Sequence, residues 1–302
     1  MPPATPPESQ AERDPPWLRL APAIFLLLWS AGFAFAKMGL AHAEPLTFLA
    51  LRYGLVLLVL LPLLPILRPP LPDTSKVWRD VIIVGFLIQA LYFGLSYLAF
   101  SHGVSAGSLA LIVSLQPILV AVLAPRLVAE RVGLKRWGGL GLGLAGAALV
   151  ILARSRVEAT SAFALACAFG ALGSMTAAAL YEKRCGTALH PVMANLIQYA
   201  VGFAVVAPMA WALEDMRVEW TAELLTALAY LVVGNSIVSV TLLLAMIRRG
   251  EVARVSALFF LVPPMAALIA WLMIGEAMPP LAWIGMACAA VGVVIASRSQ
   301  KR

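Results

Sequence analysis

The chain alternates between long apolar runs and short clusters of charged residues. Each apolar run is about 20 residues long, the length of α-helix that crosses roughly 30 Å of hydrocarbon. Because a bilayer core offers no water to bond backbone N–H and C=O groups, each run is expected to be helical. The pattern predicts an all-α membrane protein with ten transmembrane helices, over residues 17–37, 45–67, 79–101, 106–128, 134–153, 161–182, 190–212, 222–246, 252–274 and 279–297.

Composition supports this class of protein and excludes others. Of 302 residues, 62% are hydrophobic and 12% are charged, whereas an ordinary soluble domain has roughly 25% charged residues. The net charge of +7 does not indicate nucleic-acid binding, because the basic residues lie between apolar runs rather than on one face. The three cysteines lack metal-ligand spacing. We therefore expect a protein in the lipid bilayer with no metal, no cofactor and no nucleic-acid partner.

The distribution of Lys and Arg predicts how the chain is oriented. Residues 1–16, rich in Pro, Glu and Ala, are expected to form a disordered tail before the first helix. If the helices alternate in direction, 17 of the 22 Lys and Arg residues lie on the side of the N-terminus, four lie on the other side, and Arg52 lies within a helix. Cytoplasmic loops carry the excess of Lys and Arg. Both termini are therefore expected to be cytoplasmic, in a multi-pass protein of the cell's inner (plasma) membrane.

The chain also contains an internal repeat. A shift of 146 residues superimposes prolines, glutamates, tryptophans, glycines and lysines: Lys37 on Lys183, Pro45 on Pro191, Pro117 on Pro263, Glu130 on Glu276, Trp137 on Trp283, Gly139 on Gly285 and Gly146 on Gly292. This match predicts two five-helix units, residues 17–153 and 161–297. Because five is odd, the second unit enters the membrane from the opposite side. Inverted repeats provide inward-open and outward-open states around one central site, so the repeat indicates a transporter.

The repeated pattern resembles a known family. Pro117, Glu130, Trp137, Gly139 and Gly146, with their counterparts in the second unit, resemble the EamA domain, which occurs twice in the drug/metabolite transporter superfamily. The segments LLLWSAGFAFAK (26–37) and LALRYG (49–54) also resemble the start of the first EamA repeat. The second copy has Met175 in place of Trp29 and Gln198 in place of Arg52. The resemblance implies export or uptake of amino acids, their derivatives or similar metabolites. Because Arg52 is the one Lys or Arg that lies well inside a predicted helix, a neutral or zwitterionic solute fits better than a polyanion. We therefore expect an exporter of a small neutral or zwitterionic metabolite, such as an amino acid or a derivative.

Arg52 is the most informative candidate for the substrate site. A charge within a transmembrane helix costs about 2.5–3.5 kcal/mol on insertion scales, and such charges usually face the bundle interior or a watery cavity. Arg52 either binds a substrate carboxylate there, or extends to the periplasmic interface, or caps carbonyls of the first helix.

Other polar and aromatic residues within the helices complete the predicted site. The amides of Gln89 and Asn235 correspond under the shift and are expected near the midplane, in a cavity or in hydrogen bonds between helices. The full set of candidate substrate-binding residues is Trp29, Phe33, Arg52, Gln89, Tyr92, Ser96, Ser114, Gln116, Asn235, Ser239 and Phe260.

Two further repeated features predict structural roles. Glu130 and Glu276 follow the fourth and ninth helices, and we expect them to order the short loops that come next. Glycines at 139, 141 and 143, and the small residues from 285 to 289, allow close approach of the fifth and tenth helices. That approach occurs either within the subunit or in a homodimer through these two helices.

The absence of certain residues narrows the mechanism. No Asp or Glu falls in the middle of a predicted helix, so the chain lacks the embedded acid that a carboxylate-based proton antiporter needs. We therefore expect transport driven by gradients of substrate or potential. Two alternatives stay open: a transporter of lipid or hydrophobic drugs, and an intramembrane enzyme that modifies lipids. The sequence contains no HExxH zinc motif and its histidines are scattered, which favours a protein that is not an enzyme.

Overall fold

The computed structural model of the chain describes residues 20–116, 119–120, 123, 134–155, 161–185, 189–240, 242, 261–276 and 278–298. The regular elements in these ranges are helices, joined at one point by an isolated bridge between Ala43 and Val218. Six helices in the described part are long and apolar enough to cross a membrane: Ala21–Gly39, Pro45–Leu67, Ser75–Ser101, Ala162–Glu182, Val192–Leu213 and Ala222–Ser239. The prediction of an all-α membrane protein is confirmed.

The helices of the first unit follow the predicted runs within a few residues where the chain is described. They are α2 (Ala21–Gly39), α3 (Pro45–Leu60) with its continuation η2 (Leu61–Leu63) and α4 (Leu64–Leu67), α5 (Ser75–Gly85) continued by η3 (Phe86–Tyr92) and α6 (Phe93–Ser101), then α7 (Ala106–Ser114) and α9 (Leu134–Ser155). The disordered tail predicted for residues 1–16 lies outside the described residues, as do Pro117 and Glu130.

The second unit repeats this order. It consists of α10 (Ala162–Cys185), α11 (Pro191–Leu213), α12 (Ala222–Ala229) continued by η4 (Tyr230–Ser239), α15 (Val262–Ile274) and α16 (Pro280–Arg298). Pro45 and Pro191, which correspond under the shift, each begin a helix, where the missing proline N–H costs no hydrogen bond. Pro263 lies in the first turn of α15 for the same reason.

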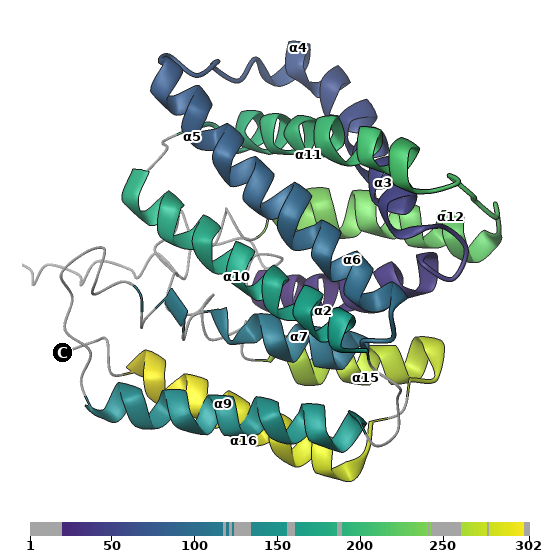
Figure 1. The fold of residues 1–302 in the computed structure, drawn as a ribbon. Helices are drawn as coiled ribbons and strands as arrows, with labels where there is room; N and C mark the ends of the chain where they lie inside the picture. Colours follow the sequence, from purple (N-terminus) through teal and green to yellow (C-terminus); the bar gives the residue numbers. More distant parts are fainter. Residues whose placement is uncertain are drawn as a thin grey trace, which may run out of the picture.

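Several helix contacts between the two units reflect the internal repeat. Helix α2 packs against η4, and its counterpart α10 packs against η3, the counterpart of η4. Helix α2 also packs against α15, and α10 against α7, but α7 and α15 are not equivalent segments: adding 146 to the bounds of α7 gives 252–260, outside the described residues. Helix α3 packs against α11, and α9 packs against α16 along most of their length (Figure 1). The first helix of each unit therefore packs against the third helix of the other unit. This is the packing of an inverted repeat around a pseudo-two-fold axis.

Glycine determines how closely α9 and α16 approach. A Cβ atom at Gly146 would lie 2.5 Å from the backbone of Gly285 and Ala289, and one at Gly292 would lie 2.4 Å from the backbone N of Gly143. The predicted glycine faces thus pack on each other within the subunit. A homodimer through the same two helices stays a prediction, and it would have to use their other faces.

The third helix of each unit contains a π-helical segment at an equivalent position. Adding 146 to the bounds of η3 (Phe86–Tyr92) gives 232–238, which falls inside η4 (Tyr230–Ser239). A π segment disturbs the regular hydrogen-bond ladder and is frequent at functional sites. In η3, the carbonyl of Leu87 accepts a hydrogen bond from Ser174 Oγ (2.7 Å), and that of Gln89 accepts one from Tyr53 Oη (2.6 Å).

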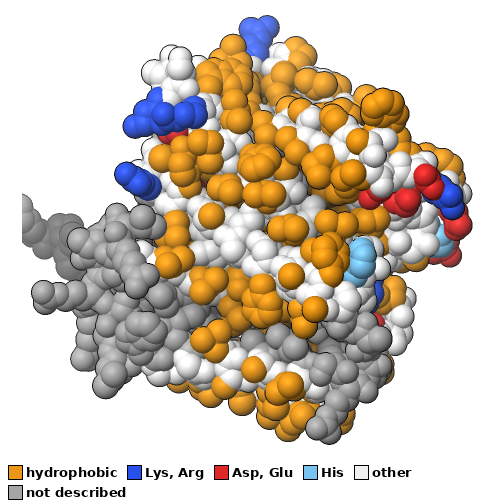
Figure 2. Space-filling model, viewed as in Figure 1, with side chains coloured by type: hydrophobic (Ala, Val, Ile, Leu, Met, Phe, Trp, Pro, Cys, Tyr) orange, Lys and Arg blue, Asp and Glu red, His pale blue; other side chains and the backbone are white. Residues whose placement is uncertain are grey.

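The surface is that of a membrane protein. Apolar side chains cover most of the described face in Figure 2, and the charged side chains gather at two opposite ends of the helices. Large residues such as Leu58, Trp211 and Leu272 are at least two-thirds exposed. In water this surface would be unfavourable, and in a bilayer it faces lipid tails.

Candidate functional site

A pocket lies between the two units at the level of the π segments. Its cavity volume is about 30 Å³, and the empty space around it is about 400 Å³ when open solvent is included. Helix α2, helix α3, the η3–α6 helix and α7 contribute from the first unit, and η4 contributes from the second. The residues that line it are Trp29, Gly32, Phe33, Ala36, Arg52, Tyr92, Phe93, Ser96, Tyr97, Phe100, Leu109, Leu231 and Asn235. Aromatic rings form much of the wall, and Arg52 is the one charged side chain among these residues.

Arg52 lies on α3 and is 1% exposed. Its Nη1 donates to Tyr97 Oη at 3.1 Å, and its Nη2 donates to Asn235 Oδ1 and Ser236 Oγ at 3.1 Å each. The guanidinium also stacks over the ring of Phe93, with 4.7 Å from Cζ to the ring centroid. This burial rules out the alternative in which Arg52 extends to the membrane interface.

The charge of Arg52 is surrounded by neutral groups. The ion pairs among the described residues are Lys37–Glu276, His42–Glu219, Arg79–Asp80 and Arg217–Asp215, and none of them includes Arg52. Its Nε atom is buried without a hydrogen-bond partner. Taking an ion out of water costs several kcal/mol, which neutral hydrogen bonds offset only in part. The pocket therefore has a local excess of positive charge, suited to an anionic group.

The structure brings six of the predicted site residues to this pocket and places the others elsewhere. Trp29, Phe33, Arg52, Tyr92, Ser96 and Asn235 line it. Gln89 and Ser239 are buried outside the lining residues, and each has a side-chain oxygen without a partner. Ser114 donates to the carbonyl of Leu111 within its own helix (2.7 Å), and Gln116 is half-buried. Phe260 lies outside the described residues.

The predicted set of site residues omits several residues of the pocket and of its immediate surroundings. Tyr97 and Ser236 hold Arg52, and Phe93 covers its guanidinium. A signal for Phe93 and Tyr97 exists, because they are four residues apart and therefore share a helix face. Gly32 also belongs to the site: a Cβ there would lie 2.4 Å from Asn235 Nδ2, so a larger residue would displace that amide.

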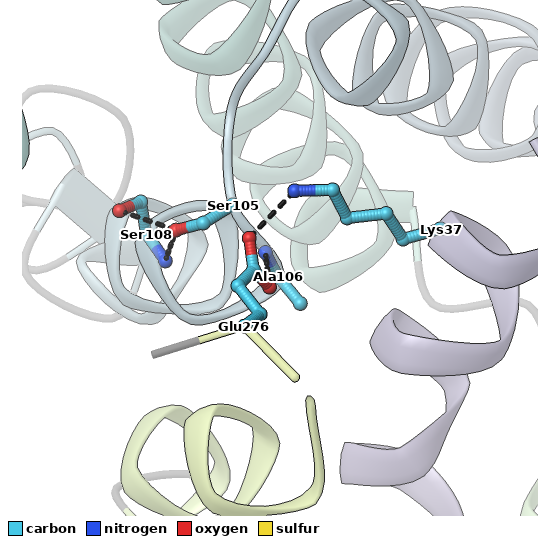
Figure 3. Close-up of polar contacts among 5 residues, drawn as sticks. All are labelled: Lys37, Ser105, Ala106, Ser108 and Glu276. Carbon is cyan, nitrogen blue, oxygen red and sulfur yellow. Dashed lines mark hydrogen bonds and ion pairs between the residues drawn. The ribbon is translucent and has the colours of Figure 1, made fainter. Parts of the chain in front are cut away.

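A second polar cluster joins the two units at one end of the bundle. Lys37, in the last turn of α2, pairs with Glu276 at 2.5 Å between Nζ and Oε1. The other oxygen of Glu276 accepts from the backbone N–H of Ala106, the first residue of α7 (3.1 Å; Figure 3). Gly275 has a φ of 66°, a conformation that glycine adopts without strain, and this turn follows α15 directly and precedes Glu276. We call Lys37, Glu276 and Ala106 the Lys37 cluster.

The Lys37 cluster extends the role predicted for Glu276. The sequence indicated that Glu276 orders the loop after its own helix. In the structure its carboxylate connects the ends of three helices from both units, α2, α7 and α15. A carboxylate at the N-terminus of α7 is favoured by the helix dipole as well as by the hydrogen bond.

Ser105, next to this cluster, is relevant to the alternative that the protein is an intramembrane enzyme. Residues 103–107 read GVSAG and match the GxSxG motif of serine hydrolases, which gives that alternative one motif in its favour. In such enzymes the serine lies on a strand-to-helix turn with its hydroxyl exposed. Here Ser105 lies between two helices, is fully buried, and its Oγ donates to Ser108 Oγ (2.8 Å) as it caps α7. Nearby His102 bonds to Ser101 and Leu98 instead.

A buried carboxylate lies near the far end of the helices from the Lys37 cluster. Asp80, on α5, is 1% exposed and accepts from Tyr181 Oη (2.9 Å) and from Arg79 Nη2 (3.1 Å). Sequence reasoning did not single it out, because it falls at the start of a predicted helix. Its position away from the pocket gives it the role of joining α5 to α10.

Membrane-length helices arranged as two inverted units around a pocket define a membrane transporter of the two-repeat type. The family model of EamA-like transporters matches residues 18–152 and, a second time, residues 162–298. The chain belongs to the EamA-like transporter family, and its relatives are transporters of the drug/metabolite superfamily. It is an integral, multi-pass membrane protein.

Individual relatives are distant. The uncharacterized transporter YvbV of Bacillus subtilis (strain 168) is 26% identical over 245 residues, which are 80% of this chain and 78% of that protein. The uncharacterized inner membrane transporter YedA of Escherichia coli (strain K12) is 22% identical, over 92% of this chain and 90% of that protein. A probable terminal-alkyne amino-acid exporter of Streptantibioticus cattleyicolor is 27% identical, over 65% of each chain.

A solved structure supports the fold alone. A crystal structure whose protein is not further described superimposes with a TM-score of 0.62 at 19% sequence identity, and the match covers 96% of this chain and all of that one. Similarity at this level of identity says nothing of the substrate.

Proposed function

We propose that the protein exports a small neutral or zwitterionic metabolite, such as an amino acid or a derivative, by alternating access between its two repeats. The pocket around Arg52 is the substrate site. The observation that carries this proposal is a fully buried cation with neutral partners, in a pocket that both repeats line. Substrate sites of inverted-repeat transporters lie at the repeat interface.

Three further observations support the substrate class. The aromatic wall, with Trp29, Phe33 and Phe100, suits an apolar side chain of modest size. The positive charge of Arg52 disfavours a cationic drug, which would need a carboxylate counter-ion. The relative from Streptantibioticus cattleyicolor, which is named as an amino-acid exporter, is consistent with this choice.

The Lys37 cluster acts in this proposal as a latch at the outer end of the pathway. The excess of Lys and Arg at the other end of the helices supports cytoplasmic termini. In that orientation, Lys37 and Glu276 lie at the extracytoplasmic end. Their ion pair joins the first repeat to the second there, and Ala36, the neighbour of Lys37, lines the pocket. Opening outward would require α2 and α15 to separate and this pair to break.

Replacing Lys37 by methionine is expected to favour the outward-open state. The change removes the ion pair of Lys37 with the carboxylate of Glu276, whose side chain is 10% exposed. A destabilisation of the closed state by about 1–2 kcal/mol corresponds to a factor of about 5–30 in population. The measurement is the rate at which a membrane-impermeant thiol reagent, added outside, labels a cysteine placed at Ala36 after the three native cysteines are replaced by serine.

A matched control breaks a different ion pair at the same end. Arg217→Met removes the pair of Arg217 with Asp215, in which both side chains are at least two-thirds exposed. Exposed pairs contribute about 0–1 kcal/mol, so labelling should stay near that of the parent protein. Equal labelling rates in Lys37→Met and Arg217→Met would contradict the latch.

A solute screen tests the proposed function itself. Purified protein is reconstituted into liposomes loaded with pooled amino acids, amines, nucleosides and sugars, and efflux is followed by mass spectrometry with and without an imposed potential. We expect selective loss of a few amino acids or close relatives, absent from protein-free liposomes. Retention of every solute would overturn the proposal and favour the lipid or hydrophobic-drug alternative.

A further inference from the structure

The pocket contains polar atoms that the folded chain leaves without partners. A guanidinium has five N–H donors, and the hydrogen bonds of Arg52 to Tyr97, Asn235 and Ser236 take three of them. The Nε–H is among the unpartnered donors. Ser96, which is 3% exposed and also lines the pocket, has a hydroxyl oxygen with no partner. Buried polar groups are nearly always satisfied, so this combination indicates a ligand that completes it.

The chemistry of these atoms matches a carboxylate. Guanidinium donors bind carboxylates through short, charge-assisted hydrogen bonds that are about twice as strong as neutral ones. The Ser96 hydroxyl can donate to a second carboxylate oxygen. A carboxylate would also neutralise the one charge among the described lining residues, which no acidic side chain does in the structure.

The pocket lacks the equivalent feature for an ammonium group. Its described lining residues include no Asp or Glu, and the side-chain oxygen of Asn235 is already an acceptor for Arg52. The rest of the lining is aromatic or aliphatic, with Trp29, Phe33 and Leu231 among it. An apolar body therefore fits against the wall whether or not it has an amino group.

We propose that the pocket selects its solute by a carboxylate, bound by Arg52 and Ser96, and that an α-amino group is not required. The substrate class is then apolar monocarboxylic acids. It includes the zwitterionic amino acids with apolar side chains of the proposed function, and it adds monoanions that have no amino group. This inference rests on the proposed function, because it takes the pocket as the substrate site, and it specifies which end of the substrate is recognised.

Three probes that share a phenyl ring separate the two charged groups of an amino acid. Phenylalanine has both the carboxylate and the ammonium, 3-phenylpropanoate has the carboxylate alone, and 2-phenylethylamine has the ammonium alone. Their affinities for the purified full chain in detergent follow from the rise in melting temperature with probe concentration, since a ligand of the native state stabilises it. We expect the two carboxylates to bind with affinities within about threefold of each other, and the amine at least tenfold more weakly.

The variant Asn235→Asp tests the role of Arg52 without removing it. The side chain keeps its size, and its carboxylate would lie where Oδ1 now lies, 3.1 Å from Arg52 Nη2. An internal carboxylate competes with that of the solute, so affinity for both carboxylate probes should fall at least tenfold while the amine is not weakened. Ser96→Ala should weaken the carboxylate probes severalfold.

Asn195→Asp provides the matched control. It makes the same substitution at a half-buried residue of α11 that does not line the pocket, and it should leave all three affinities unchanged. Binding of the amine as tightly as 3-phenylpropanoate, binding of none of the probes, or unchanged carboxylate affinity in Asn235→Asp would overturn the inference. The liposome screen distinguishes the failure of this inference from the failure of the proposed function. No efflux of any solute would overturn the proposed function, whereas efflux confined to solutes without a carboxylate would overturn this inference alone.

Discussion

Arg52→Gln is expected to lower solute efflux from proteoliposomes at least about 100-fold. The change removes the charge that attracts the substrate carboxylate and disrupts the hydrogen bonds to Tyr97, Asn235 and Ser236 that shape the pocket. A hundredfold loss corresponds to about 2.7 kcal/mol, within the cost of truncating one partner of a buried charged contact. The measurement is the initial rate of efflux per reconstituted protein, normalised to the amount of folded chain.

Two comparison variants make this prediction specific. Arg52→Lys keeps the charge but loses the planar set of donors, so it should retain a small part of the activity. Arg217→Gln removes an arginine whose side chain is 79% exposed, and efflux should stay at the level of the parent protein. An Arg52→Gln variant that folds and exports at the parent rate would show that the pocket around Arg52 is not the substrate site.

The double variant Gly146→Ala/Gly292→Ala is expected to lose stability substantially. Each new Cβ would lie about 2.5 Å from backbone atoms of the facing helix, so α9 and α16 must separate. Overpacking costs about 1–3 kcal/mol per site in well-packed cores. The melting temperature of the detergent-purified protein should therefore fall by several degrees, and more than in either single variant.

Gly141, also on α9, provides a control in which the substitution is not expected to lower the melting temperature. Nothing lies within 4 Å of the position that a Cβ would take at Gly141. Since alanine favours a helix interior over glycine by about 1 kcal/mol, Gly141→Ala should keep or raise the melting temperature. If the double variant is as stable as Gly141→Ala, the close contact of α9 with α16 does not contribute to the fold.

Much of the fold follows from the sequence because its two main patterns, the apolar runs and the internal repeat, extend over many residues. The solvent enforces helix over each apolar run, and the 146-residue shift relates residues such as Pro45 and Pro191 that begin equivalent helices. The glycine pattern also predicts the close approach of α9 and α16. These signals depend on spacing along the chain, which a sequence displays directly.

The site was predictable only in part, because its geometry depends on contacts between repeats. The shift places Gln89 and Asn235 at equivalent positions, yet only Asn235 lines the pocket. Arg52 explains the difference: it draws the Asn235 amide toward the first repeat, whereas its own counterpart, Gln198, has no charge to do the same for Gln89. The ion pair of Lys37 with Glu276 could not be predicted from the shift either, because the shift relates each residue to its equivalent in the other repeat rather than to its partner.

The isolated charge of Arg52 also has an electrical consequence for the transport cycle. One elementary charge that crosses the whole membrane potential gains or loses about 2.3 kcal/mol per 100 mV. In alternating access, the empty carrier returns to its starting conformation while the charge of Arg52 is not cancelled. This charge then crosses whatever part of the membrane potential the site traverses. A bound monoanion cancels that charge, so voltage then acts on the return of the empty carrier and leaves the loaded step nearly untouched. With a zwitterion the net charge persists, and voltage acts on both steps alike.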